Sequence, residues 1–178
     1  MAKRKPKLLD AGELAEYAAR LLGLRAYSIS ELRLRLRRRA AQEGDVEPLI
    51  SRLKQAGLVD DRRFAEGFAT ARRDSRGFGK GRVLRDLAGR RVAPQVARRA
   101  VEEAYAGADE RQMIEDFLAR KYRGKRLPEF LAEEKNLMSA YRKLRYAGFS
   151  SGASISVLKQ YAAAAVELES LGEEGVQE

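Results

Sequence analysis

Residues 57–65, GLVDDRRFA, combine the stop signal of one helix with the start signal of the next. Gly57 suits the left-handed position that follows a helix end, because it has no Cβ to clash. Asp60 is placed to accept hydrogen bonds from the free backbone N–H groups of the next turn. Val59 and Phe64 then fall at the two positions of a hydrophobic staple. The segment therefore predicts a tight corner between two helices.

Similar helix signals recur along the chain, and apolar residues between them follow spacings of three and four. Residues 32–37, LRLRLR, alternate as a strand does. We interpret them as helix, because leucine and arginine are strong helix formers and no β-branched residue is present. The predicted N-caps are Asp10, Ser28 in a capping box with Glu31, Asp45, and Asp109 with Gln112 in the reciprocal position, and the last helix is predicted to start at Ser151 or Ser154.

The helices form a repeat, with a first helix, a short second helix carrying basic residues, and a third helix that closes each unit. Leu36, Leu87 and Leu144 occupy equivalent places in the three second helices. Modules that bury too little alone gain stability by stacking. The predicted fold is all-α, with three tandem three-helix modules forming an elongated, curved helical-repeat protein. The predicted boundaries are 1–9 for a basic flexible arm, 10–58, 59–107 and 108–166 for the three modules, and 167–178 for an acidic tail.

The composition argues against an enzyme. The chain has no cysteine and no histidine, so the commonest general base and the commonest metal ligands are missing. Asp60 and Asp61 form an adjacent acidic pair, but neighbours at a helix start point apart, and no other carboxylate is placed to complete a magnesium shell. Capping explains Asp60 more simply. We expect no catalytic residue, no metal and no cofactor.

A glycine-rich segment at residues 75–82, SRGFGKGR, raises the question of a phosphate-binding loop. A Walker loop would need glycine where Asp74 stands and serine or threonine where Gly81 stands. A dinucleotide loop would need glycine at Arg82 and a preceding strand. The segment is better interpreted as a flexible basic connector between two helices.

The charge balance indicates an anionic partner. The net charge is +10, from 36 lysines and arginines against 26 aspartates and glutamates, and a basic body most often meets nucleic acid or an acidic protein surface. The alternative is a solvated, arginine-rich helical surface without a partner. No apolar run reaches the length of a membrane span, and no apolar core follows the basic start. We therefore expect a soluble, cytoplasmic protein without a membrane partner.

The basic side chains on the second helices, and those around the glycine connector, are the candidate contact residues. Because equivalent helices in a solenoid face the same way, we expect these groups to line one continuous side of the protein. The candidates are Arg33, Arg37, Arg72, Arg73, Arg76, Lys80, Arg82, Arg85, Arg142, Lys143 and Arg145.

Four segments together resemble the RecX regulators of the bacterial recombinase RecA. They are residues 30–33 (SELR), the corner at 57–65, the connector at 77–82 (GFGKGR) with the following Leu87, and residues 148–150 (GFS). The resemblance covers about residues 14–161. The chain departs from the family pattern at residues 40–45, which lack the usual Gly-Phe or Gly-Tyr turn, and at residues 124–136, which look inserted.

The resemblance implies three tandem three-helix modules and a monomer that binds along the groove of the RecA–DNA filament. It further implies inhibition of RecA's ATP hydrolysis, strand exchange and co-protease activity, and so modulation of DNA repair and the SOS response. Contact with single- and double-stranded DNA would be weak and electrostatic. The alternative is a general helical-repeat nucleic-acid-binding protein. Such a protein normally offers aromatic side chains for base stacking, whereas most tyrosines and phenylalanines here fall on core stripes.

Overall fold

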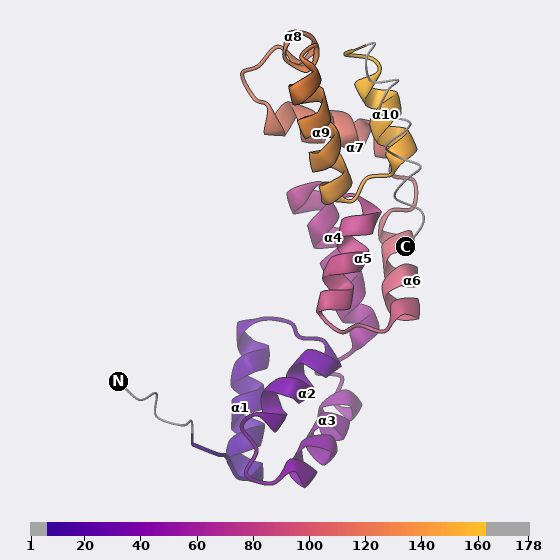
Figure 1. Ribbon diagram of the computed structural model, residues 1–178. Helices are drawn as coiled ribbons and strands as arrows, with labels where there is room; N and C mark the ends of the chain where they lie inside the picture. Colours follow the sequence, from indigo (N-terminus) through magenta and orange to yellow (C-terminus); the bar gives the residue numbers. More distant parts are fainter. Residues whose placement is uncertain (1–6, 163–178) are drawn as a thin grey trace, which may run out of the picture. The chain divides into compact units, whose positions relative to one another are not determined.

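A computed structural model describes residues 7–162 of the protein, and these residues form helices joined by short turns without a β-sheet (Figure 1). The first six residues of the predicted arm and the whole predicted acidic tail lie outside the described residues. In chain order the elements are α1 (Ala11–Leu24), α2 (Ile29–Arg37), the 3₁₀ turn η1 (Glu43–Asp45), α3 (Val46–Gln55), α4 (Asp61–Arg76), α5 (Lys80–Gly89), α6 (Pro94–Ala104), α7 (Glu110–Lys121), α8 (Leu127–Leu131), α9 (Glu134–Ala147) and α10 (Ser151–Leu158).

The chain divides into two compact units. Within the described residues, unit 1 comprises residues 7–68 and 86–100, and unit 2 comprises residues 69–85 and 101–162. Helices α4, α5 and α6 contribute residues to both units, so the second predicted module is shared between them.

The core of unit 1 is built by α1, α2 and α3. Leu14, Leu32, Leu36 and Ile50 are almost completely buried in it, and each lies on an apolar stripe with helical spacing. Two predicted helix starts are confirmed. Asp10 and Ser28 each accept a hydrogen bond from the third residue of their helix, and Glu13 and Glu31 return the bond to the cap backbone, which completes two capping boxes.

The predicted cap at Asp45 is wrong. Asp45 lies in the 3₁₀ turn that runs directly into α3, its backbone is helical (φ −76°, ψ −18°), and its side chain makes no capping hydrogen bond. An N-cap needs an extended backbone so that its side chain can turn back onto the next N–H groups. The short helical turn before α3 removes that geometry.

The last residues of the predicted basic arm, residues 7–9, belong to the described structure. Leu9 is buried and exchanges backbone hydrogen bonds with the segment after α2, donating to Arg39 and accepting from Ala41. The chain before α1 is therefore attached to the core of unit 1 at this point.

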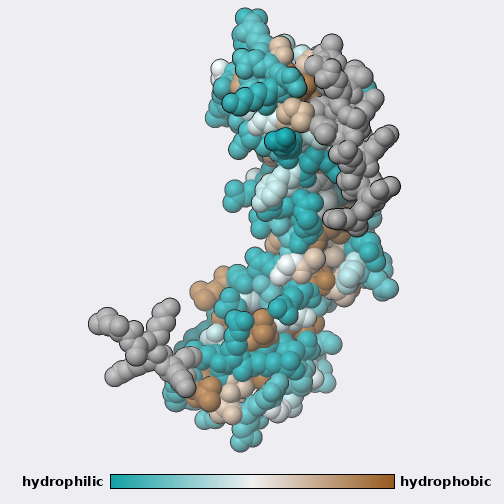
Figure 2. Space-filling model, viewed as in Figure 1, coloured by the Kyte–Doolittle hydropathy of each residue, from teal (hydrophilic) through white to brown (hydrophobic). Residues whose placement is uncertain are grey.

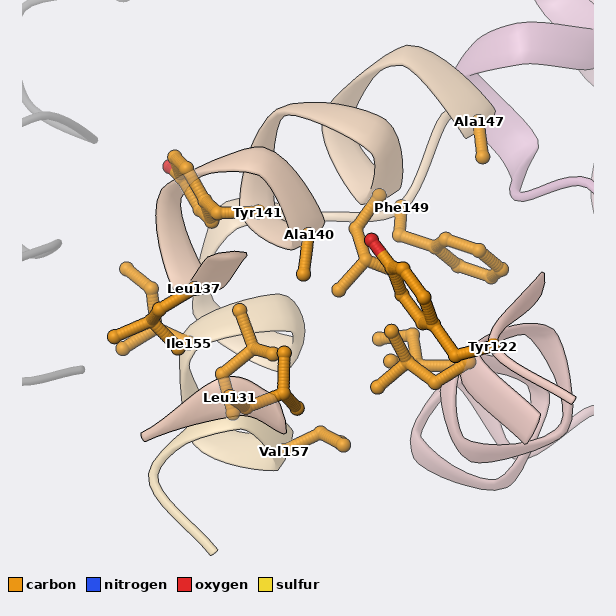
Figure 3. Packing of buried hydrophobic residues seen from close by; sticks show 13 residues of the cluster. Tyr122, Leu131, Leu137, Ala140, Tyr141, Ala147, Phe149, Ile155 and Val157 are labelled. Carbon is orange, nitrogen blue, oxygen red and sulfur yellow. The ribbon is translucent and has the colours of Figure 1, made fainter. Parts of the chain in front are cut away.

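A second cluster of buried side chains lies in unit 2, among α7, α8, α9 and α10. Leu131, Leu137, Phe149 and Val157 are labelled in this cluster in Figure 3, and each is at most 1% exposed. Helix α8 was not predicted as a separate helix. It lies in the segment at 124–136 that looked inserted, and it places Leu131 in the core. The stretched third module therefore contains four helices instead of three.

Helix starts in unit 2 match the predictions in part. Asp109 caps α7 as predicted, but Gln112 bonds to Asp116 instead of returning to the cap. Helix α10 begins at Ser151, one of the two predicted starts, and the preceding Ser150 is its N-cap and accepts from Ala153 N–H. Ser154, one of the two predicted candidates, is buried and donates to the Ser150 carbonyl.

The repeat itself is confirmed by the burial of its marker residues. Leu36 in α2, Leu87 in α5 and Leu144 in α9 are each completely buried, as expected for equivalent positions on three second helices. The described residues are thus all-α, with tandem modules built on three helices. Hydrophilic residues dominate the visible surface, and hydrophobic ones are scattered among them (Figure 2).

Candidate interaction surface

The corner at residues 57–65 has the predicted backbone. Gly57 is left-handed, with φ of +67°. Asp60 accepts hydrogen bonds from the N–H groups of Arg62 (2.7 Å) and Arg63 (3.0 Å) at the start of α4. These backbone N–H groups, Arg63 first, hold the pKa of the Asp60 carboxyl below its usual range.

The second aspartate of the pair has a different structural partner. Asp61 accepts a hydrogen bond of 2.8 Å from the N–H of Ile29, at the start of α2. Each carboxylate therefore satisfies backbone donors of a different helix start, which are otherwise left without intrahelical partners. This explains an adjacent acidic pair at the corner without a metal. Among the described residues, no three histidine, cysteine, aspartate or glutamate side chains gather into a metal-binding group.

Phe64 at this corner is only half-buried. Its ring stacks on that of Phe68, with the centroids 5.9 Å apart. The two rings line a shallow groove in unit 1 together with Arg25, Arg63 and Arg90. The ring of Phe64 is therefore neither enclosed in the core nor fully exposed. One face of α4 carries an aromatic pair bordered by arginines.

The glycine segment at residues 77–82 packs closely against the backbone at the end of α9, and we call this contact the glycine crossing. The interpretation of the segment as a flexible connector is wrong. The N–H of Gly79 donates to the Ala147 carbonyl (2.9 Å), and that of Gly81 donates to the Gly148 carbonyl (3.0 Å). A Cβ at Gly79 would lie 2.4 Å from the Gly148 oxygen, so no larger residue fits. The start of α5 is thereby fixed against the end of α9.

Tyr105, which directly follows α6, holds the same segment. Its hydroxyl donates a hydrogen bond of 2.5 Å to the Phe78 carbonyl. Burial raises the pKa of Tyr105 to about 12, so the phenol keeps its proton and remains a donor at neutral pH. The glycines and Tyr105 together determine where the first turn of α5 presents its arginines.

The basic residues of the first module are paired with carboxylates. Arg33 makes two hydrogen bonds to Glu47 on α3, at 2.7 and 3.1 Å. Arg37 lies 3.3 Å from Glu47 and 3.4 Å from Glu43. The hydrogen bond from Arg33 holds the pKa of the Glu47 carboxyl below its usual range. Glu43 and Glu47 therefore offset much of the positive charge on this face of α2.

The basic residues at the end of α4 and in the first half of α5 divide into three groups by what they contact. Arg73 pairs with Asp74 at 2.7 Å and also donates to the Ala104 carbonyl, and Lys80 pairs with Glu102 at 2.7 Å. Arg82 and Arg85 instead face the end of α9. The Arg82 guanidinium lies 4.5 Å from the ring centroid of Tyr146, and Arg85 donates to the Tyr146 carbonyl at 2.9 Å. Arg72 is half-buried and Arg76 is exposed.

The basic residues of α9 differ from those of α2 because no acidic side chain is paired with them. Arg142 is exposed and forms no ion pair within residues 7–162. Lys143 is half-buried, donates to the Tyr122 hydroxyl at 3.3 Å and lies 5.1 Å from its ring. Arg145 donates to the Phe149 carbonyl at 2.6 Å. Lys143 and Arg145 thus contact neutral groups, and none of these three cations forms an ion pair within the described residues.

Four residues at this site were not among the predicted contact residues, and two of them, Lys135 and Tyr146, are exposed. Together with Met138, Ser139, Arg142 and Lys143 they line one open groove along α9. The sequence contains a signal for them, since Lys135, Ser139, Arg142 and Tyr146 follow helical spacing on the side away from the core residues Leu137, Tyr141 and Leu144.

The structure therefore brings some predicted contact residues together. Arg82 and Arg85 of α5 contact the end of α9. Helix α9 also carries Arg142 and Lys143, and all four residues belong to unit 2. Arg33 and Arg37 belong to unit 1, so the single continuous stripe stays a prediction. Within residues 7–162, no helix combines the length and apolarity needed to cross a bilayer.

Comparison with known proteins places these features in a family. A family model described as RecX, second three-helix domain, matches residues 60–101. The regulatory protein RecX of Chromohalobacter salexigens is 44% identical over 85 residues, which cover 48% of this chain and 55% of that protein. The regulatory protein RecX of Amycolatopsis mediterranei is 31% identical over 142 residues, which cover 79% of this chain and 78% of that protein.

A solved structure supports the same fold. The crystal structure of RecX from Lactobacillus salivarius superposes with a TM-score of 0.65 at 15% identity, covering 85% of this chain and 96% of that one. The sequence match to the Amycolatopsis protein extends over most of both chains, and the matched family model includes residues 60–65 of the corner and the glycine segment at 77–82. This chain belongs to the RecX family of regulatory proteins.

Proposed function

We propose that this protein binds the RecA–DNA filament as a monomer in the cytoplasm and lowers RecA's ATP hydrolysis, strand exchange and co-protease activity. By this route it would modulate DNA repair and the SOS response. Family membership carries the proposal. On this view the protein performs no catalysis of its own and acts by occupying a surface of the filament.

The unpaired cations along α9 support an anionic partner. Lys135 and Arg142 are exposed and form no ion pair among residues 7–162, and no acidic residue lines the groove that they share. A charge without an intramolecular partner adds little to the stability of a fold, but it attracts an anionic polymer over several ångströms. A filament that carries DNA is such a polymer.

The test measures DNA-dependent ATP hydrolysis by the cognate RecA. We expect the parent protein to lower the rate at amounts well below one molecule per RecA subunit, because one molecule bound along a filament affects many subunits. In a pull-down, RecA should be captured only when DNA and a slowly hydrolysed ATP analogue are both present. Tight capture of bare duplex at physiological salt, with no effect on RecA, would favour the alternative of a general nucleic-acid-binding protein.

A matched pair of variants locates the contact. Lys135→Gln with Arg142→Gln removes two unpaired positive charges, whereas Arg33→Gln with Arg37→Gln removes two paired ones. Both changes lie on the surface and should alter the free energy of unfolding by about 1 kcal/mol or less. We expect the α9 pair to weaken inhibition of RecA more than the α2 pair does. Equal effects would mean that total charge, and not the α9 groove, governs binding.

We also propose that Arg72, Arg73 and Arg76 contribute to the contact with the filament. Because Arg73 also holds the Ala104 carbonyl and Asp74, neutralising all three residues would disturb a structural contact as well as the surface charge. Arg76→Gln alone is the cleaner probe of this part of the surface. A small loss of inhibition with unchanged stability would include Arg76 in the contact.

A further inference from the structure

Tyr146 differs from every other aromatic side chain of the protein. The seven tyrosines and six phenylalanines all lie within the described residues, and Tyr146, at 70% exposure, is the only one of them that is classed as exposed. Its hydroxyl makes no hydrogen bond to any residue in the described range 7–162. The ring therefore contributes little to the core, although it lies on a well-packed helix.

The ring of Tyr146 is held in a defined position. It lies in the last turn of α9, directly before Ala147 and Gly148, whose carbonyls bind the glycine crossing. The Arg85 guanidinium binds the Tyr146 carbonyl at 2.9 Å, and that of Arg82 lies over the ring at 4.5 Å from the centroid. Since Arg82 covers one face of a ring that is 70% exposed, the other face is open. A cation on one face of an aromatic ring is a stable arrangement that a second flat group can extend.

Positive charges continue from the ring along the same face of α9. Lys135, Ser139, Arg142 and Tyr146 succeed one another at intervals of four, three and four residues, which places them on one side of a helix. From Lys135 to Tyr146 this row spans about 16 Å, at roughly 1.5 Å per residue. Lys143 lines the same groove, and no carboxylate does.

We propose that this face of α9 binds single-stranded DNA, with one base stacked on the open face of Tyr146 and the phosphates beside Lys135, Arg142 and Lys143. An exposed aromatic ring joined to a row of cations is the combination that single-strand binding uses. In duplex DNA the bases are already stacked inside the helix and cannot reach such a ring, so the site favours single strands. The inference deepens the proposed function, and it rests on that function for the choice of DNA as the physiological strand.

The positive charges alone would suit an acidic protein segment as well as a nucleic acid. The ring of Tyr146 distinguishes between these two partners. An acidic protein segment gains nothing from a flat aromatic ring beside the cations, because the negative face of the ring repels a carboxylate. A base offers a flat π-surface to Tyr146 while its phosphates meet the cations. The observations therefore favour nucleic acid at this site, and an acidic segment of RecA becomes an outcome of the test.

The experiment measures binding of the full chain, without RecA, to a labelled oligothymidine and to a strand of equal length in which the central bases are removed but the phosphates are kept. We expect Tyr146→Ala to weaken binding to oligothymidine about 5-fold or more, as loss of one stacked base predicts. Tyr146→Phe should bind as the parent does. On the strand without central bases, parent and Tyr146→Ala should bind alike. Equal weakening of both strands by Tyr146→Ala would overturn the proposal.

Salt dependence separates the ring from the cations. Lys135→Gln with Arg142→Gln should reduce the slope of log affinity against log salt by about 1.4, because two phosphate contacts are lost and each contributes about 0.7 on a single strand. Tyr146→Ala should leave the slope unchanged. Since the chain has no tryptophan, Tyr146→Trp also supplies a single reporter, whose fluorescence should be quenched by oligothymidine. An unquenched tryptophan in the bound state would overturn base stacking.

The outcome for RecA is read separately. If Tyr146→Ala binds oligothymidine as the parent does but no longer captures RecA in the presence of DNA and the ATP analogue, the ring serves a protein partner and the proposal is overturned. If Tyr146→Ala loses oligothymidine while the parent protein proves unable to inhibit RecA, the single-strand site stands and the proposed function fails.

Discussion

Two corners of the molecule share one local design and differ in what packs against them. The first follows α3 and the second follows α9. Each begins with a left-handed glycine, Gly57 with φ of +67° and Gly148 with φ of +92°. Each then reaches a side chain that caps the next helix, Asp60 before α4 and Ser150 before α10.

The difference lies in the space around the glycine and in the residue that follows it. Nothing lies within 4 Å of the place where a Cβ on Gly57 would be. A Cβ on Gly148, in contrast, would lie 2.0 Å from the backbone nitrogen of Arg82. Leu58, directly after the first glycine, is 59% exposed, but Phe149, directly after the second, is 1% exposed. The first corner is a joint between helices. The second also receives the start of α5, and so it positions Arg82 and Arg85 beside Tyr146.

The largest expected difference concerns the aromatic residue near each corner. Phe149→Ala should lower the free energy of unfolding by about 3–5 kcal/mol, because it empties a fully enclosed position. Phe64→Ala should cost only about 1–2 kcal/mol, because its half-buried ring gives up less apolar area. Chemical denaturation of both variants tests this. Equal losses would show that Phe64 is as enclosed as Phe149 and that the corners do not differ in packing.

The two left-handed glycines provide the next comparison. Gly57→Ala should cost about 1–2 kcal/mol, the strain of a left-handed backbone with a Cβ. Gly148→Ala adds a backbone clash to that strain and should cost about 3 kcal/mol. Denaturant midpoints decide between these values, and Gly152→Ala, where nothing lies within 4 Å of the new Cβ, serves as the control in the same unit. A Gly148→Ala cost no larger than that of Gly57→Ala would mean that the crossing opens easily.

The helix starts were predictable because their signals are local. Ser28 and Glu31 lie three residues apart, and the capping box between them depends on little else. Asp45 shows the limit of this reasoning, since a 3₁₀ turn before it changes the backbone that a cap requires. The start of α10 could be predicted only as Ser151 or Ser154, because several serines lie close together there, and the structure places it at Ser151.

The glycine crossing was not predictable because its two sides are distant in sequence. Gly79 and Gly148 look like turn residues when each is considered alone, and only the structure shows that their backbones touch. The same limit applies to charge. Nothing in the sequence near Arg33 says that Glu47 neutralises it, or that Arg142 has no such partner. Tyr146 was missed because tyrosines were assigned to core stripes, although it lies only two residues from Leu144 and so off that stripe.

The caps of the two corners differ in their response to pH. Asp60→Ala should lower the free energy of unfolding by about 0.5–2 kcal/mol at pH 7. Because the pKa of Asp60 is lower in the folded than in the unfolded protein, its contribution is present above the unfolded pKa of about 4 and is lost as the pH falls through the folded value. The difference between parent and Asp60→Ala, followed by thermal melts, should therefore shrink as the solution is acidified below about pH 4.

Exchanging the cap types provides the control. Asp60→Ser introduces the residue that caps α10 at the second corner and keeps an oxygen for the N–H groups of α4. It should retain most of the stability at pH 7 and lose the acid-dependent part. If Asp60→Ser and the parent protein lose stability in parallel below pH 4, other carboxylates and not the cap account for the acid response.

The smallest expected effect is at Leu58, the counterpart of Phe149 by position after the glycine. Leu58→Ser exchanges an exposed apolar side chain for a polar one, and we expect the free energy of unfolding to change by about 0.5 kcal/mol or less. Denaturant unfolding measures this, with Phe149→Ser as the matched change at the buried position, where a polar group without a partner should cost several times more. A loss above about 1 kcal/mol for Leu58→Ser would mean that the leucine packs against the fold, and the two corners would then be alike. With stability unchanged, the same variant also tests whether the first corner contacts the filament, since only a contact there would reduce inhibition of RecA.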